Sequence, residues 1–239
     1  MEPSIRYLAR MPSEGVSPGS PELLLLPTER ERALFLAEWP RGLALVEACG
    51  FGPVASAARS AELLARLRPR RVCLVGIAGT FDPRSAPVGS ARVFDSVVQD
   101  GIGVGRGASF RGPSALGLPQ WPGSESCAAI HDTLVLARPH VPGALADPLG
   151  LLLTVPSASA TEIEAAERRE RFPRAIVEDM EGFAVALASA LRGVPLVIVR
   201  GISNRVGDRR ANEWRIPEAM AAARELARAV LSAPWEPPA

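Results

Sequence analysis

The sequence predicts an α/β protein with three layers, α/β/α, built around a mixed and mostly parallel central sheet. Short apolar runs of strand length alternate with longer helical patterns along the chain, as in successive βαβ units. Of the 239 residues, 47% are hydrophobic, which is enough for the buried core of one large α/β domain. Because no internal repeat and no linker divides the chain, we expect a single domain over residues 21–233.

The N-terminal half begins with residues 1–20, which are rich in Pro, Ser and Gly and are expected to form a flexible extension. A helix is predicted to start after Thr28, which suits an N-cap. Seven glycines in residues 101–123 indicate a long loop. The other predicted elements of this half are strands at residues 22–26, 43–49, 71–76 and 88–99, and a helix at 54–67.

The C-terminal half is expected to continue the alternation. The run at 195–199 is apolar throughout, so this strand is expected to be buried on both faces of the sheet. Gly193, just before it, suits the end of the preceding helix. The remaining patterns predict a strand at residues 149–155 and helices at 160–171, 182–191 and 216–231.

The composition excludes several kinds of chemistry. The net charge of +1 gives no broad electrostatic basis for binding nucleic acid or an acidic membrane. All 27 basic residues are arginine, so no lysine exists for a Walker A motif or a Schiff base. No signal peptide or transmembrane run is evident, and we expect a cytoplasmic protein with reduced thiols and no metal. Metal-binding spacing is absent from the cysteines and histidines, which are Cys49, Cys73, Cys127, His131 and His140.

Two carboxylates occupy positions where chemistry is expected. Glu31 follows the first strand and stands three residues after Thr28, so it either completes a capping box or serves as a catalytic carboxylate. Glu181 opens an apolar helix, where it either faces the helix dipole or binds a ligand. An Arg, a Ser and an Asn in residues 200–204 follow the strand at 195–199, and ligands of parallel sheets bind at such carboxyl ends.

Several short motifs occur together over residues 22–231. In combination they resemble the nucleoside phosphorylase and nucleosidase superfamily, and within it they are most similar to the futalosine hydrolases of menaquinone biosynthesis. The blocks at 180–182 and 200–204 are specific at this separation, whereas either alone is weak. The matching motifs are PTERE at 27–31, CGFGPVA at 49–55, VGIAG at 75–79, VG at 88–89, VEDMEG at 177–182 and VRGISN at 199–204, with Arg209 and Trp214 behind them.

The resemblance implies a nucleoside phosphorylase-like fold and a role for each matching residue. Glu181 would accept hydrogen bonds from the ribose 2′- and 3′-hydroxyls, and Met180 would pack against the sugar. Glu31 would position and deprotonate the attacking water, which Arg200 would help to order. The base and the sugar would also be lined by Ala78, Gly79, Ser159, Ser203 and Asn204.

Asn204 distinguishes the chain from the related adenine-releasing nucleosidases, which carry aspartate at the matching position. A 6-oxopurine offers an acceptor at O6, to which the asparagine NH₂ can donate, while the amide oxygen accepts from N7–H as the base leaves. A mismatched buried polar group costs about 1–3 kcal/mol. The sequence therefore favours hypoxanthine over adenine as the leaving group, with Asn204 as a second catalytic residue.

Water rather than phosphate is the expected nucleophile. The hexameric phosphorylases have an arginine and a serine at the positions that read Leu74 and Ile77 here, so two phosphate ligands are replaced by apolar residues. The related nucleosidases also carry serine where Ile77 stands, so one hydroxyl that orders water is missing. The aryl carboxylate on the 5′ side of futalosine would meet Arg106 or Arg111, unless these are solvated surface arginines.

The expected function is hydrolysis of the N-glycosidic bond of futalosine, which releases hypoxanthine and dehypoxanthine futalosine without a metal or an organic cofactor. Two alternatives remain open. The chain could be another purine nucleosidase or nucleoside phosphorylase, of the inosine or methylthioadenosine type, or it could be a non-catalytic nucleoside-binding protein. By analogy with the family, we expect a homodimer or a larger homo-oligomer that takes a small nucleoside and has no nucleic acid or membrane partner.

Overall fold

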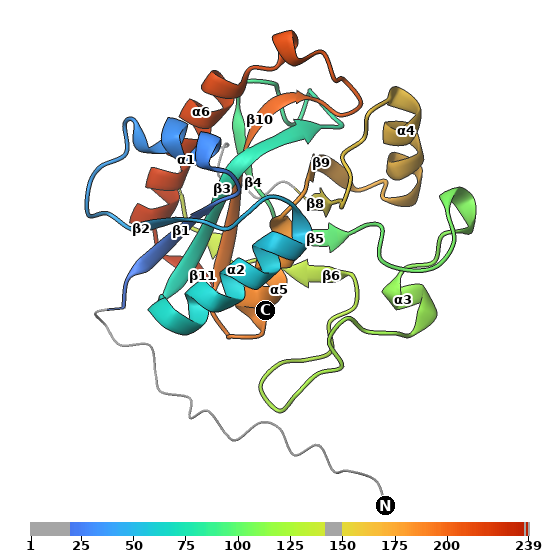
Figure 1. Ribbon diagram of the computed structural model, residues 1–239, viewed down its shortest axis with the longest axis horizontal. Helices are drawn as coiled ribbons and strands as arrows, with labels where there is room; N and C mark the ends of the chain where they lie inside the picture. The colour runs from blue at the N-terminus through green and yellow to red at the C-terminus, as the bar shows by residue number, and fades with distance from the viewer. Residues whose placement is uncertain (1–19, 142–149, 237, 239) are drawn as a thin grey trace, which may run out of the picture.

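One nine-stranded sheet forms the centre of the structure, a computed structural model that describes residues 20–141, 150–236 and 238 (Figure 1). Its strands are β1 (Glu22–Leu26), β2 (Leu45–Ala48), β3 (Arg71–Thr80), β4 (Ala91–Val93), β5 (Ser96–Gln99), β6 (Thr133–Val135), β8 (Leu151–Thr154), β9 (Ala175–Asp179) and β10 (Leu196–Arg205). Seven of them follow the order β2-β1-β3-β9-β8-β5-β6, and β10 pairs with β3 and β4. A separate small sheet joins β7 (Arg138–Pro139) to β11 (Trp235–Glu236).

The sheet is mixed and mostly parallel, as the sequence predicted. β1, β2, β3 and β10 form one parallel set, and β5, β8 and β9 form a second. The two sets meet in antiparallel pairing at the tips of β3 and β9, where Gly79 lies opposite Glu178 and Thr80 lies opposite Val177. Both sets therefore bring the carboxyl ends of their strands to the same place.

Helices cover both faces of the sheet, which confirms the three-layer α/β/α architecture (Figure 1). The helices of the structure are α1 (Glu29–Leu36), α2 (Gly52–Leu67), α3 (Pro113–Leu116), α4 (Glu162–Arg171), α5 (Gly182–Ala190) and α6 (Ile216–Ser232). On one face α2 and α5 share a core with Leu23 and Leu25, and on the other α1 and α6 share a core with Leu24 and Leu26. Alternate residues of β1 enter opposite cores, because side chains alternate across a strand.

Two strands are longer than predicted. β3 continues to Thr80 instead of ending near Gly76, and β10 continues to Arg205 instead of ending near Val199. The small residues in these segments are typical of turns, but the two strands pair with each other along their whole length. Pairing between strands therefore overrides a weak local preference.

Other segments also differ from the prediction. The β-like run predicted at 88–99 forms two short strands, β4 and β5, which pair with different strands. The loop at 101–123 contains α3 and a 3₁₀ helix, Gly107–Ser109. The strands β6, β7 and β11, which were not predicted, span only two or three residues each.

Part of the prediction falls on segments that are not described. Residues 1–19 of the predicted extension and residue 149 of the predicted strand at 149–155 lie outside the described residues. Among the residues that are described, no helix combines the length and the apolar character needed to cross a membrane.

Candidate active site

A cavity of about 300 Å³ opens where the two parallel sets of strands meet. It is lined by the ends of β3, β9 and β10 and by the starts of α1 and α2. Eight of the nine residues predicted for the site line it: Glu31, Ala78, Gly79, Ser159, Met180, Glu181, Ser203 and Asn204. The ninth, Arg200, is not part of the cavity lining and is fully buried next to it.

Glu31 lies in the first turn of α1, and its side chain reaches the cavity. The Thr28 hydroxyl oxygen accepts a hydrogen bond from the Glu31 N–H at 3.2 Å, so Thr28 caps α1 as predicted. The Glu31 carboxylate accepts from the backbone N–H of Ile77 at 2.9 Å and from the Thr28 hydroxyl at 2.6 Å. Glu31 is only 6% exposed, and these bonds fix its carboxylate at the end of the cavity formed by α1 and β3.

Glu181 belongs to a buried charge network with Asp179 and Arg200. Its carboxylate accepts hydrogen bonds from the Gly52 N–H at 3.0 Å and from Arg200 Nη2 at 3.2 Å. Arg200 also donates from Nε and Nη2 to Asp179 Oδ2, at 2.9 and 2.5 Å. It is Asp179 that accepts from the first backbone N–H of α5, at Gly182, so the Glu181 carboxylate does not cap this helix.

The burial of this network shifts the pKa of Glu181. Burial raises it to about 7, and the negative charges of Asp179 and Glu31 add to the rise, while the Arg200 guanidinium and the Gly52 N–H oppose it. Burial alone would lower the pKa of Arg200, but the facing carboxylates raise it above its usual value. Glu181 therefore titrates near neutrality beside a permanent positive charge.

Arg200 retains one unpaired donor next to Gly76. Among the described residues, Nη1 has no hydrogen-bond partner although it is buried. A Cβ placed on Gly76 would lie 2.2 Å from Nη1 and 3.0 Å from Glu31 Oε1, so both atoms flank one point above this glycine. Glycine at position 76 leaves space between the guanidinium and the carboxylate.

Asn204 lies near the end of β10 with both ends of its amide engaged. Oδ1 accepts a hydrogen bond from the Ser203 hydroxyl at 2.7 Å, and Nδ2 donates to the Arg205 carbonyl at 2.8 Å. Nδ2 also donates to the Asp208 carbonyl at 3.5 Å, a contact at the long limit of a hydrogen bond. Asn204 can therefore offer a ligand one acceptor lone pair and, in exchange for this weak contact, one donor.

A third group of residues, which the sequence did not predict, holds the segment 157–159. Glu178 accepts hydrogen bonds from the N–H of Ser159 at 2.8 Å and from its hydroxyl at 2.7 Å. Arg168 donates to Glu178 at 2.8 Å and to the carbonyl of Ser157 at 2.6 Å. The charged pair thus fixes the segment at which the base is expected to bind.

One side of the cavity is lined from α1 and from the segment that leads into α6, by Arg30, Arg209, Trp214 and Ile216. Phe51, just before α2, also lines the cavity, as do Pro27, Thr28, Ala158 and Val206. By contrast, Arg106 and Arg111 are exposed and do not line the cavity, so they take no part in it. Leu74, one of the two apolar replacements for phosphate ligands, is fully buried, and Ile77 lines the cavity.

The other candidate chemical groups lie outside the cavity. Cys49 and Cys73 are buried, as predicted. Burial and the nearby Glu181 carboxylate raise the pKa of Cys49 to about 12, which keeps this thiol protonated. Within the described ranges, no three His, Cys, Asp or Glu side chains are grouped so that they could hold a metal ion.

Comparison with known proteins establishes the family. A sequence model of the phosphorylase superfamily matches residues 17–233. The chain belongs to this superfamily. A curated futalosine hydrolase from Streptomyces coelicolor is 37% identical over 186 residues, which cover 73% of this chain and 73% of the relative. Another, from Thermus thermophilus, is 33% identical over 76% of this chain and 76% of the relative.

Solved structures agree with this assignment. A 5′-methylthioadenosine/S-adenosylhomocysteine nucleosidase from Colwellia psychrerythraea, in complex with adenine, matches with a TM-score of 0.68 at 21% identity and covers 89% of this chain and 95% of that one. A likeness at this identity shows the fold alone, and it confirms the nucleoside phosphorylase-like fold. The resemblance to the futalosine hydrolases is confirmed by the curated relatives, as is the enzyme class, an N-glycosyl hydrolase.

Proposed function

We propose that this protein hydrolyses the N-glycosidic bond of futalosine and releases hypoxanthine and dehypoxanthine futalosine. The observation that carries the proposal is the amide of Asn204, which has one free acceptor lone pair and one donor held only by a 3.5 Å contact to the Asp208 carbonyl, in the same cavity as two buried carboxylates. The similarity to curated futalosine hydrolases supports the same substrate. We assign the reaction to a cytoplasmic homo-oligomer in menaquinone biosynthesis, where the family acts.

The base is recognised by its 6-oxo group in this proposal. The Nδ2 hydrogen that meets the Asp208 carbonyl at 3.5 Å donates to O6 instead, and Oδ1 accepts from N7–H once the departing base has been protonated by solvent. Ser159 supports the base through main-chain groups, and the Glu178–Arg168 pair keeps that segment in place. Adenine has an amino group at C6, which would face the NH₂ group of Asn204 with two donors and no acceptor between them. This mismatch would weaken binding by about 1–3 kcal/mol.

The sugar lies between the base and the nucleophile. The Glu181 carboxylate accepts from the ribose 2′- and 3′-hydroxyls, Met180 packs against the ring, and Ala78 and Gly79 allow the backbone to approach closely. Arg200 holds Glu181 from behind and favours its charged form. Binding a diol in this way requires Glu181 to be ionised.

The attacking water is positioned by Glu31 in the proposed mechanism. The C1′–N9 bond lengthens first and gives a sugar with oxocarbenium character. As the bond breaks, the base leaves as the hypoxanthine anion, which takes a proton at N7 from solvent. Glu31 takes a proton from the attacking water as the water oxygen bonds to C1′. Arg200 Nη1, which flanks the same point above Gly76 as Glu31, supplies the second contact to the water.

Several observations favour hydrolysis over the alternatives. Leu74 and Ile77 are apolar and cannot bind a phosphate nucleophile at these two positions, which disfavours phosphorolysis. A protein that only bound nucleosides would not need a buried carboxylate aimed at the nucleophile position, so Glu31 speaks for catalysis. The proposed chemistry requires neither a metal nor an organic cofactor.

The test is product release in phosphate-free buffer from futalosine and from aminodeoxyfutalosine, followed by chromatography of the free base. We expect hypoxanthine from the first and little adenine from the second. Comparable adenine release would show that Asn204 does not set the base preference. Turnover that depends on added phosphate would identify a phosphorylase, and no release from any purine nucleoside would leave a binding protein.

A further inference from the structure

The α1 and α6 side of the cavity has a chemical character of its own. The base and ribose positions are assigned to residues 78–79, 158–159, 178–181, 203–204 and 206, and the nucleophile position to Glu31. Apart from Pro27, Thr28 and Ile77, what remains of the lining is two arginines, two aromatic rings and one isoleucine: Arg30, Phe51, Arg209, Trp214 and Ile216. In the proposed binding mode, these five residues receive the 5′ substituent of the nucleoside.

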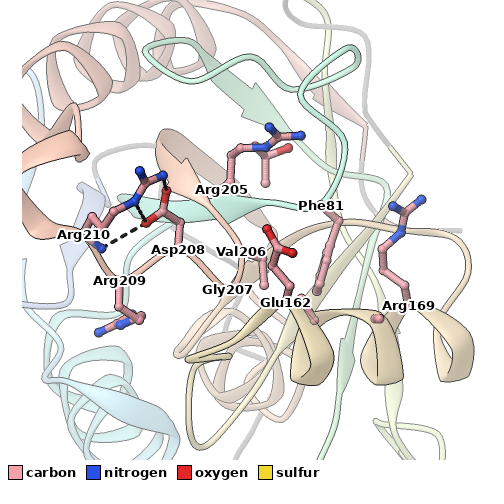
Figure 2. A pocket seen from close by; sticks show the side chains of 12 residues that line it. Phe81, Glu162, Arg169, Arg205, Val206, Gly207, Asp208, Arg209 and Arg210 are labelled. Atoms are coloured by element: carbon pink, nitrogen blue, oxygen red, sulfur yellow. Dashed lines mark hydrogen bonds and ion pairs between the residues drawn. The ribbon is translucent and has the colours of Figure 1, made fainter.

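The two arginines carry uncompensated charge. Most arginines near them are paired, for example Arg32 with Glu29 and Arg210 with Asp208. Among the described residues, neither Arg30 nor Arg209 has an ion pair or a side-chain hydrogen bond. Figure 2 shows that the Arg209 side chain points away from the neighbouring Asp208–Arg210 pair. Two unpaired cations in one cavity favour an anionic ligand.

Arg209 is held in an orientation suited to a carboxylate. Its guanidinium lies over the Trp214 ring, 4.8 Å from the ring centroid. Stacking of this kind occupies the flat face of the guanidinium and leaves the N–H groups at its edge free to form a two-pronged contact. The Trp214 N–H is itself fixed by a hydrogen bond of 3.1 Å to the Asp208 carbonyl. Trp214 is therefore a fixed platform for Arg209.

Phe51 supplies the apolar part of the same region. It precedes α2 and lines the cavity, yet it is 65% exposed. An exposed ring at a cavity wall can cover an apolar or aromatic ligand group, and aromatic pairs add stabilisation beyond burial. An aromatic group next to a negative charge would satisfy Phe51 and the two arginines together.

We propose that Arg209, stacked on Trp214, binds together with Arg30 a carboxylate that is attached to an aromatic group on the 5′ side of the substrate. This inference rests on the proposed function and names the residues that select its substrate. A neutral 5′ end, such as the hydroxyl of inosine, would leave both arginines unused. The two residues would thus separate nucleosides with an anionic 5′ arm from simple purine nucleosides.

The experiment measures kcat/KM of the purified full-length chain for three substrates: futalosine, its methyl ester and inosine. The ester removes the negative charge and keeps the aromatic group. The variants Arg209→Gln and Arg30→Gln remove one cation each. Arg205→Gln is the matched control, because Arg205 is an exposed arginine that lines the neighbouring cavity of about 800 Å³ instead (Figure 2).

We expect each cavity variant to lower kcat/KM for futalosine about tenfold or more, the factor that corresponds to about 1.4 kcal/mol. The values for the ester and for inosine should change by less than about twofold in this scheme, since a neutral arm makes no charged contact. Added salt should weaken the wild-type preference for futalosine over its ester. Arg209→Lys, which keeps the charge, should recover part of the loss.

The proposal is overturned if the cavity variants lose the same factor on all three substrates, or if they behave like Arg205→Gln. If Arg209→Gln does not fold, the wild-type protein still tests the proposal: a preference for futalosine over its ester that does not change with added salt would overturn it. Failure of the proposed function gives a different result, because the wild-type chain would then release no hypoxanthine from futalosine at all.

Discussion

The hydroxyl of Ser203 donates a hydrogen bond of 2.7 Å to the side-chain oxygen of Asn204. Together with the bond from Nδ2 to the Arg205 carbonyl, it fixes which end of the amide carries the donor and which the acceptor. A carboxylate at the same position would have no donor for O6 of a 6-oxopurine. The base preference of the site should therefore depend on this one side chain.

Asn204→Asp should reverse the preference for the base. We expect hypoxanthine release from futalosine to fall about tenfold or more. The aspartate carboxylate and O6 of the base are both hydrogen-bond acceptors, so the contact between them is lost at a cost of about 1–3 kcal/mol. Adenine release from aminodeoxyfutalosine should rise relative to it. The ratio of the two kcat/KM values measures the change, and Ser203→Ala should lower the ratio less. An unchanged ratio in Asn204→Asp would contradict the assignment.

Glu31→Gln should abolish turnover while substrate still binds. Gln keeps an acceptor for the Ile77 N–H but cannot take a proton, and loss of a general base costs about 10²–10⁴ in rate. Binding can be followed by fluorescence, since Trp214 lines the cavity. Glu29→Gln is the control, because this exposed carboxylate in the same helical turn only pairs with Arg32. Full activity of Glu31→Gln would exclude the role.

The pH dependence should reflect Glu181. Its pKa of about 7 means that the free enzyme holds a neutral carboxyl below neutrality and a carboxylate above it. Only the carboxylate accepts hydrogen bonds from both ribose hydroxyls, so kcat/KM should rise with pH through about 7 and then level off. A profile measured from pH 5.5 to 8 tests this. A flat profile over this range would mean that Glu181 is already ionised or does not bind the sugar.

Much of the fold could be predicted from sequence because its signals are local. Apolar runs such as 22–26 and 195–199, with helical patterns between them, indicate the α/β class without tertiary information. Glu31 and Glu181 are recognisable because they stand where a strand ends or a helix starts.

The rest depends on contacts between distant segments. Glu178 of β9 meets Ser159 and Arg168 only when α4 folds back beside β8 and β9, which no local pattern encodes. Asp179 of β9 reaches Arg200 of β10 because β3 pairs with both of these strands. The lengths of β3 and β10 were also set by their mutual pairing and not by local propensity. Arg106 and Arg111 were considered because their loop is rich in glycine, but the loop lies away from the cavity.

Gly76→Ala should damage the site although the added methyl group is small. The new Cβ would lie 2.2 Å from Arg200 Nη1 and 3.0 Å from both Glu31 Oε1 and Pro27 Cδ. Arg200 is fully buried and bound to Asp179, so it has little room to move away. Overpacking of this kind costs about 1–3 kcal/mol, and here it also separates the two groups proposed to hold the water.

We therefore expect Gly76→Ala to lower both the urea midpoint of unfolding and kcat, with kcat falling further than in a variant of equal stability. Gly112→Ala is the matched control, because an added Cβ there meets its nearest atom at 3.4 Å and has no positive φ to oppose it. If both variants unfold at the same urea concentration and retain wild-type kcat, Arg200 and Glu31 cannot be arranged tightly around position 76. A loss of stability alone, with kcat intact, would separate the packing of Arg200 from its proposed contact with water.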